Sequence, residues 1–281
     1  MIKQAIIPLA GLGTRLLPLT SVFAKELWPI NGKPGLEYIL EECIEAGINE
    51  VIFIISKKKL MIKKYFYNDK FYKDIIKRKK DPRILTEYKK ILKYKKMIKF
   101  VFQDKPLGTG DAVLKTKKFI KDKYFLMLLP DDLIIRKNCS KSMISIHKKF
   151  NSSVMASMKV DKKNVSRWGI YNIKEKIDSM NFFIKSVVEK PTIKQAPSNN
   201  AVIGRYILPK TIFSKLLNLK PSKGGEIHIT DAIQLLIDDN NKFVGHNFSG
   251  KYLDCGTMTG YINSTLEIAK KWNYAWLALV T

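Results

Sequence analysis

Apolar runs and segments of helical periodicity alternate along the first half of the chain. Four short, largely apolar runs are predicted to be strands: residues 4–9, which include β-branched side chains, and residues 51–55, 98–102 and 124–129. Residues 36–46 carry apolar side chains at helical spacing and are followed by Gly47, a typical C-terminal cap. Residues 57–99 and 111–119 are also predicted to be helical. Strands separated by helices predict a parallel sheet covered on both faces.

The second half of the chain is more mixed. A strand is predicted at residues 154–160, then short β segments at 169–173, 183–188 and 201–207, and helices at 211–217, 230–238 and 261–272. We expect the α/β fold class: a Rossmann-like, mostly parallel mixed sheet flanked by helices, with a C-terminal mixed β portion over the cleft at its mouth. No proline-rich linker or long repeat divides the 281 residues, so we expect a single domain, 1–281.

Composition narrows the class of protein. A hydrophobic fraction of 46% excludes wholesale disorder, and no apolar run approaches the roughly 20 residues that cross a bilayer. The N-terminus lacks the pattern of a secretory signal. Cys43, Cys139 and Cys255 are odd in number and widely spaced, which fits a reducing cytoplasm better than a disulfide framework. We therefore expect a cytoplasmic protein with no membrane partner.

The formal charge of +26 allows a nucleic-acid partner, because lysine-rich surfaces release counterions from phosphate backbones. However, only six of the 51 basic residues are arginine, the usual residue for bidentate recognition of bases and phosphates. Lysines are densest between Lys57 and Lys99, where interleaved aromatic residues could stack on bases or could pack a helical segment onto the sheet. A codon bias toward lysine is a further explanation. We favour a solvated lysine surface over a nucleic-acid partner.

The stretch AGLGTR follows the first predicted strand. Gly11 and Gly13 leave main-chain N–H groups accessible, Arg15 can add bidentate donors, and Lys25 can add a mobile point charge. These features predict an anion site at the end of a strand. The stretch is not a Walker loop, and Leu16 takes the place of the third glycine of a dinucleotide fingerprint. A simple tight turn is an equally good interpretation of the loop alone.

Acidic residues follow two other predicted strand ends. Asp131 and Asp132 lie in LLPDDLI, and Asp254 precedes a glycine turn in LDCGTMTGY. Two such carboxylates could hold Mg²⁺ beside a polyphosphate, or could simply open loops. Glu189 and Lys190, in VVEKP, could bind sugar hydroxyls and an anionic group, or could be a surface ion pair before a proline turn.

Taken together, the motifs resemble those of the sugar-1-phosphate nucleotidylyltransferases. The matching stretches cover roughly residues 3–270 and are PLAGLGTRLLP, KELWPINGKP, LPDD, WGIY, VVEKP, APSNNAVIGRYIL, GGEIHITDAI and LDCGTMTGY. APSN…GRY and the helical segment at 57–96 favour the uridylyltransferase branch. The resemblance implies a nucleotide-diphospho-sugar transferase fold and transfer of a uridylyl group from UTP to glucose 1-phosphate with Mg²⁺. The alternatives are a thymidylyltransferase and a catalytically silent regulatory relative.

The resemblance also assigns residues to roles. Residues 1–150 would bind the nucleotide and residues 151–281 the sugar. Leu9, Gly11, Gln103 and Gly108 match positions that hold the pyrimidine, and Gly11, Gly13, Thr14 and Arg15 match those at the phosphates. Lys25 would span the triphosphate and the incoming phosphate, Asp131 and Asp254 would hold Mg²⁺, and Lys190 would neutralise the sugar phosphate. Glu189 would accept sugar hydroxyls, and Gly169, Val202 and Asn200 would line the sugar pocket. A homo-oligomer, either a dimer or a tetramer, is expected.

The sequence departs from the family's pattern at four positions. Ala24 stands where proline is usual, Trp28 where a smaller apolar residue is usual, and Asp111 where histidine is usual in this branch. Asp132 replaces an apolar residue, so the metal role is assigned to Asp131. The three histidines have no ligand constellation and are predicted to be structural.

Overall fold

The computed structural model describes residues 2–222 and 224–271. Its strands are β1 Gln4–Pro8, β2 Pro29–Ile30, β3 Lys33–Pro34, β4 Glu50–Ile55, β5 Ile98–Phe102, β6 Tyr124–Leu128, β7 Asp132–Ile135, β8 Ser153–Lys159, β9 Gly169–Lys176, β10 Asn181–Glu189, β11 Asn200–Pro209, β12 Phe243–Asn247 and β13 Lys251–Asp254. Its α-helices are α1 Gly35–Glu45, α2 Leu60–Tyr67, α3 Asp69–Lys79, α4 Pro82–Met97, α5 Gly108–Leu114, α6 Cys139–Phe150, α7 Ile212–Asn218, α8 Ile229–Asp238 and α9 Met258–Lys271.

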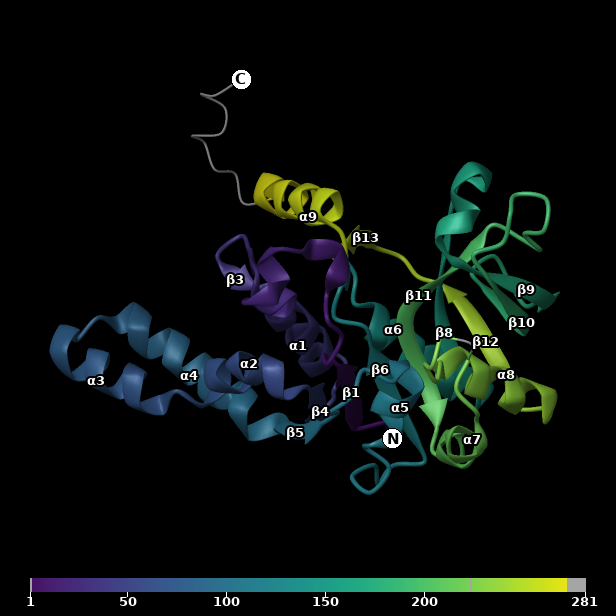
Figure 1. The fold of residues 1–281 in the computed structure, drawn as a ribbon. Coiled ribbons are helices and arrows are strands. Elements are labelled where there is room, and N and C mark those ends of the chain that lie inside the picture. Colours follow the sequence, from purple (N-terminus) through teal and green to yellow (C-terminus); the bar gives the residue numbers. More distant parts are fainter. Residues whose placement is uncertain (1, 223, 272–281) are drawn as a thin grey trace.

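A single mixed sheet runs through the molecule in the order β5-β4-β1-β6-β11-β8-β12-β10-β9 (Figure 1). The N-terminal strands β5, β4, β1 and β6 pair in parallel, as the alternation of strands and helices predicts. The pairing turns antiparallel from β6 to β11, and β8–β12 is parallel again. The mixed, helix-flanked α/β sheet is therefore confirmed. The C-terminal strands extend the same sheet, and the division near residue 150 stays a prediction.

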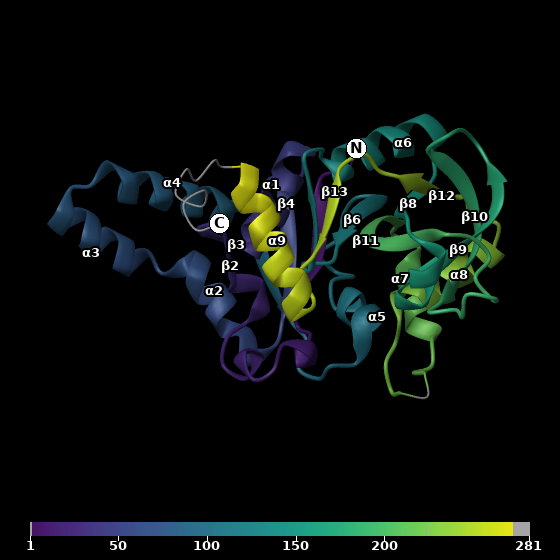
Figure 2. The ribbon, with the colours of Figure 1, turned by 90° about the horizontal axis from the view of Figure 1, so that it is seen from above.

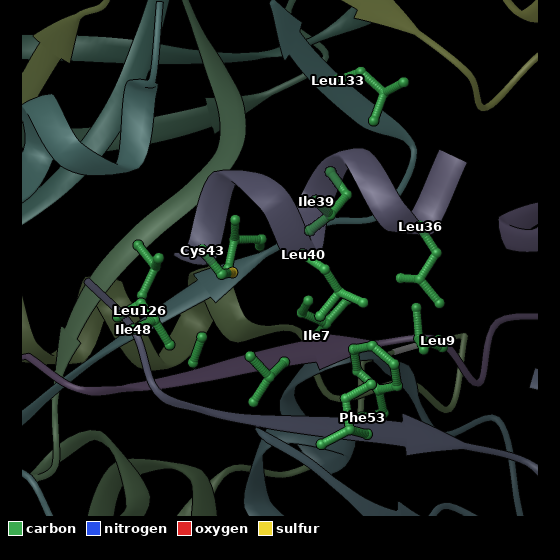
Figure 3. Close-up of a cluster of buried hydrophobic side chains, with 14 of the residues drawn as sticks. Ile7, Leu9, Leu36, Ile39, Leu40, Cys43, Ile48, Phe53, Leu126 and Leu133 are labelled. Atoms are coloured by element: carbon green, nitrogen blue, oxygen red, sulfur yellow. The ribbon is translucent and has the colours of Figure 1, made fainter. Parts of the chain in front are cut away.

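Successive side chains of a strand point to opposite faces of the sheet, so apolar strands present apolar side chains on both faces, and helices cover both. Ile7 and Phe53 lie in one core cluster, under α1 and α6, whereas Ile6 and Ile52 lie in the other, under α5, α7 and α8. Figure 3 shows the first cluster, in which apolar side chains of α1 meet those of β1 and β4. These strands are apolar on both faces because helices cover both.

The lysine-rich segment forms three helices, α2, α3 and α4, as predicted. α3 and α4 form an arm that projects away from the sheet (Figures 1 and 2). Tyr72 and Tyr88 stack on each other across the arm, with ring centroids 5.2 Å apart. Phe66 is completely buried in the core cluster under α1. Aromatic side chains therefore pack the arm and its base, which agrees with the packing interpretation.

Some elements differ from prediction. The helix predicted at 111–119 is wrong in its bounds: α5 begins at Gly108 and ends at Leu114. After it the main chain forms tighter turns, in which the Thr116 N–H donates to the Val113 carbonyl at 2.9 Å. α6 was not predicted, although Asn138 before it caps the helix by accepting from the Lys141 N–H. The helix predicted at 261–272 begins at Met258, and Trp272 lies outside the described residues. No described helix is long and apolar enough to span a membrane.

Candidate active site

The loop after β1 leaves main-chain N–H groups free to bind an anion. Gly13 has a φ of 68°, in the left-handed region that favours glycine, and caps the 3-10 turn Thr14–Leu16. Within the described residues, the N–H groups of Gly11, Leu12 and Gly13 have no hydrogen-bond partner. Together with the exposed guanidinium of Arg15, they offer several donors to phosphate oxygens at one edge of the sheet.

Lys25 and Asp131 form an ion pair beside this loop. Lys25 Nζ lies 2.6 Å from Asp131 Oδ2, and both side chains are mostly buried. Burial by itself would lower the pKa of Lys25 and raise that of Asp131. Their mutual attraction outweighs burial, so the pKa of Lys25 is raised and that of Asp131 is lowered. Both groups are therefore charged at neutral pH.

The two predicted metal ligands are brought together by the pairing of β7 with β13. Asp132 lies opposite Asp254 in this pair, and the Cys255 N–H donates to the carbonyl of Asp131 at 2.8 Å. A Cβ on Gly256 would lie 3.0 Å from Asp131 Oδ2 and 3.2 Å from Asp254 Oδ1, so both carboxylates border the space that this glycine leaves.

This donor set fits a divalent cation only in part. The described residues contain no group of three or more acidic, histidine or cysteine side chains suited to a metal ion. The carboxylates of Asp131 and Asp254 would therefore need phosphate oxygens and water to complete the coordination. Mg²⁺ bound beside a polyphosphate has this requirement, since it takes one or two carboxylates and keeps several waters.

Asp132, the second acid of the LPDD stretch, is engaged by the protein. Its Oδ1 accepts from the Tyr252 hydroxyl at 2.7 Å, and its Oδ2 accepts from the Gly204 N–H at 2.8 Å. Burial and the charge of Asp131 raise the pKa of Asp132 to about 6. Both oxygens of Asp132 accept hydrogen bonds from the protein, whereas Lys25 contacts Asp131 at Oδ2, so Asp131 stays the predicted metal ligand.

A buried ion pair lies behind these acids. Arg205 is completely buried, and its guanidinium donates to both oxygens of Glu42, at 3.1 and 2.9 Å. It also donates to the carbonyls of Leu129 and Asp132. These two residues flank Pro130 and Asp131, so Arg205 holds both sides of the segment that carries Asp131.

The residues predicted to bind the sugar meet at the junction of β9, β10 and β11. A Cβ on Gly169 would lie 2.9 Å from Glu189 Oε2 and 3.4 Å from Val202 Cγ2, so a larger residue would push into both side chains. Lys190 has a φ of 44° and donates its N–H to the Trp168 carbonyl at 3.0 Å. Gly169, Glu189, Lys190 and Val202 line a cavity of about 470 Å³ together with Asp254.

A second cavity, of about 480 Å³, lies over the glycine loop. The predicted nucleotide residues that line it are Gly11, Gly13, Thr14, Arg15, Gln103 and Gly108. Gln103 is buried, and its Nε2 donates to the Gly108 carbonyl at 3.1 Å and to Asp111 Oδ2 at 2.8 Å. Asp111, which departs from the family's pattern, is thus the partner of Gln103.

The two cavities adjoin, because Arg15, Leu129 and Asp131 line both. The strand ends predicted to meet are therefore brought together. Two predicted residues lie outside the cavities. Leu9 is completely buried and its side chain belongs to the core of Figure 3, so only its main chain could contact a base. Asn200 is also buried, and neither residue lines a cavity of the site.

Sequence reasoning missed three charged residues of the site: Glu26, Arg167 and Glu226, the last of which lines the nucleotide cavity. Glu26 lines the nucleotide cavity and accepts from Lys59 Nζ at 2.7 Å, while its Oε2 is buried without a partner among the described residues. Arg167 lines the sugar cavity. Glu26 and Glu226 lie within the motif stretches KELWPINGKP and GGEIHITDAI, and Arg167 directly precedes WGIY, so their positions were the available signal.

Two other departures from the family's pattern are accommodated locally. Ala24 has a φ of −61°, close to the value that proline imposes, so alanine there needs no change of the backbone. Trp28 is buried and packs edge-on against Tyr261, with ring centroids 5.1 Å apart. The Tyr261 hydroxyl donates to the Pro29 carbonyl at 2.6 Å, which joins α9 to this segment.

A glycine loop with accessible main-chain N–H groups, a lysine and two carboxylates at the strand ends of an α/β sheet are features of enzymes that act on nucleotide phosphates. The chain belongs to the nucleotidyl transferase family, whose family model matches residues 4–271. This confirms the resemblance found in the motifs, and enzymes of this family generally use a divalent metal.

Individual relatives are similar over nearly the whole chain. The putative UTP–glucose-1-phosphate uridylyltransferase of Methanocaldococcus jannaschii is 36% identical over 271 residues, covering 95% of this chain and 93% of that protein. A UTP-bound UGPase from Acinetobacter baumannii is 31% identical with a TM-score of 0.90, covering 100% and 99% of the two chains. A UDP-glucose pyrophosphorylase complexed with UDP-glucose is 35% identical with a TM-score of 0.84, covering 96% and 100%.

Proposed function

We propose that this enzyme transfers the uridylyl group of UTP to α-D-glucose 1-phosphate, giving UDP-glucose and pyrophosphate. The observation that carries the proposal is that Arg15 and Asp131 border both a cavity over the glycine loop and a cavity holding Glu189 and Lys190. A nucleoside triphosphate and a sugar phosphate can therefore bind side by side. The relatives named for this reaction support UTP over a thymidine nucleotide.

The phosphate of glucose 1-phosphate attacks the α-phosphorus of UTP in line, and pyrophosphate leaves. The enzyme forms no covalent intermediate in this proposal, so catalysis comes from positioning and from stabilisation of charge. The glycine loop and Arg15 bind the phosphates that depart. Lys25 neutralises charge at the α-phosphate, and Lys190 neutralises the attacking phosphate, which reduces the repulsion between two anions.

Asp131 and Asp254 are proposed to hold Mg²⁺, which when bound neutralises phosphate oxygens and orients the two substrates. Lys25 is the present partner of Asp131, at 2.6 Å. Both charges of this pair are in place before substrate binds. Glu189 accepts hydrogen bonds from the sugar hydroxyls, and Gly169 and Val202 shape the sugar cavity.

A panel of nucleotides and sugar phosphates tests the proposal. Purified enzyme is incubated with Mg²⁺, glucose 1-phosphate and UTP, dTTP, CTP, ATP or GTP, and pyrophosphate release is measured. We expect UTP to give the highest kcat/KM. Faster turnover of dTTP would instead make the enzyme a thymidylyltransferase, and no turnover with any pair would refute the proposal.

Two further properties complete the proposal. A homo-oligomer, a dimer or tetramer, is expected and is measured by light scattering during size-exclusion chromatography. A cytoplasmic location is favoured by the free thiols of Cys43, Cys139 and Cys255, of which the first two are buried.

A further inference from the structure

Asp111 lies behind the wall of the nucleotide cavity and contacts one of its polar groups. Its side chain is buried and does not line the cavity, whereas its neighbour Ala112 does. Asp111 Oδ2 accepts from Gln103 Nε2 at 2.8 Å, and Asp111 Oδ1 lies 3.4 Å from Lys115 Nζ. Gln103 is thus held from outside the cavity that it lines.

The contacts of Gln103 allow its amide only one orientation. The amide can in principle turn by 180°, which exchanges its oxygen and its nitrogen. Its Nε2 donates to two groups that can only accept, the Gly108 carbonyl at 3.1 Å and the Asp111 carboxylate at 2.8 Å. Turning the amide would place Oε1 against both acceptors, so that each loses its hydrogen bond from Gln103 and faces a third oxygen, which is costly for buried groups.

The orientation determines what the cavity offers to a base. With both Nε2 protons in use, Gln103 presents only its Oε1, which accepts no hydrogen bond among the described residues. Gly11 and Gly108, which line the same cavity, have main-chain N–H groups without partners in the described part of the chain. An acceptor near main-chain donors matches a base edge whose ring N–H lies between two carbonyl oxygens.

We infer that Asp111 is a positioning residue that fixes the Gln103 amide with its oxygen toward the base, and so selects uracil over cytosine. The inference rests on the proposed function for the location of the base. Uracil offers its N3–H to Gln103 Oε1, whereas cytosine has a lone pair at N3 that this oxygen repels. Asp111 itself touches no substrate, and acts only through Gln103.

The alternative is a purely structural role, in which Asp111 stabilises the fold as a buried acid in the first turn of α5 paired with Lys115. That role predicts a lower melting temperature without any change in base preference. The ratio of the dissociation constants for CTP and UTP separates the two roles, and it can be measured by calorimetry whether or not the enzyme turns over.

The test compares Asp111→Asn with Lys115→Met. Asparagine has the shape of aspartate but can also donate, so it satisfies Gln103 in either orientation. We expect Asp111→Asn to lower the CTP-to-UTP ratio of dissociation constants about tenfold, the effect of one hydrogen bond to a charged group. Lys115→Met removes the other partner of Asp111 and should leave the ratio unchanged. In the Gln103→Leu background, Asp111→Asn should have no further effect on the ratio.

An unchanged ratio in folded Asp111→Asn, or an equal change in Lys115→Met, would overturn the inference. If Asp111→Asn does not fold, Asp111→Ser, with its smaller side chain, and the single variant Gln103→Leu are each compared with the unaltered protein. The same ratio of dissociation constants then tests the inference. Failure of the proposed function has a different signature: unaltered enzyme that forms no UDP-glucose. Selective binding of UTP that depends on Asp111 would still hold in that case.

Discussion

Replacement of Arg205 by methionine removes the cation from the buried ion pair behind the active site. The guanidinium is completely buried, and Glu42, which is 7% exposed, would lose its charged partner. Methionine fills much of the same volume but cannot donate to Glu42, nor to the carbonyls of Leu129 and Asp132. With the Gly204 carbonyl, which also accepts from Arg205, the change leaves one buried charge and three carbonyls without these donors.

The expected loss of stability follows from this geometry. Breaking one partner of a buried, hydrogen-bonded ion pair costs roughly 3–5 kcal/mol, because the remaining charge stays desolvated. For a chain of this size, 1 kcal/mol lowers the melting temperature by about 2 °C, so Arg205→Met should lower it by roughly 6–10 °C. Adding Glu42→Leu removes the orphaned charge and should restore part of this loss.

Circular dichroism at a fixed heating rate measures these melting temperatures. Lys163→Met is the matched control, because the ion pair of Lys163 with Asp161 is exposed and contributes at most about 1 kcal/mol. A shift below about 2 °C for Arg205→Met, or a double variant less stable than Arg205→Met, would refute the reasoning. Turnover should also fall, since Arg205 holds the two residues that flank the Asp131 segment.

Three other predictions concern single side chains. Lys25→Met should lower kcat by orders of magnitude in the pyrophosphate assay, because the charge that faces the phosphates is lost; near-normal turnover would contradict its role. Asp131→Asn should raise the Mg²⁺ concentration needed for half-maximal activity, and unchanged activity at limiting Mg²⁺ would count against this ligand. Burial lowers the pKa of His246, which bonds Asn181 and Ser142 as a neutral ring. Its contribution to stability is therefore complete above its unfolded pKa of about 6.5 and declines as pH falls below that value. Between pH 7.5 and pH 5.5, unaltered protein should lose more melting temperature than His246→Gln, and equal losses would show that this histidine does not titrate as stated.

Much of the fold could be predicted because its signals are local. After their first residues, Gln4 and Glu50, β1 and β4 are apolar at consecutive positions, since helices cover both faces of the sheet, and this pattern is visible without any structure. The short pair β7–β13 could not be predicted, because each strand is stabilised by a partner more than a hundred residues away. Sequence spacing alone does not indicate such a pairing.

The candidate site was also predictable from the sequence only in part. The sequence alone determined the types of functional group, since glycines after a strand, Lys25 and two acidic strand ends predict phosphate and metal binding once the resemblance of all the motifs is included. Only the tertiary structure decided that Asp131 pairs with Lys25 at the border of both cavities while Asp132 is held by Tyr252 and Gly204, although the two acids are neighbours.

The tertiary structure also placed the side chain of Leu9 in the core and paired Asp111 with Gln103. Local patterns specify strands, helices and the types of functional group, because hydrophobic burial and backbone geometry act over a few residues. The partner of each polar group depends on which segments the folded sheet brings within about 3 Å, since hydrogen bonds and ion pairs act only at that range.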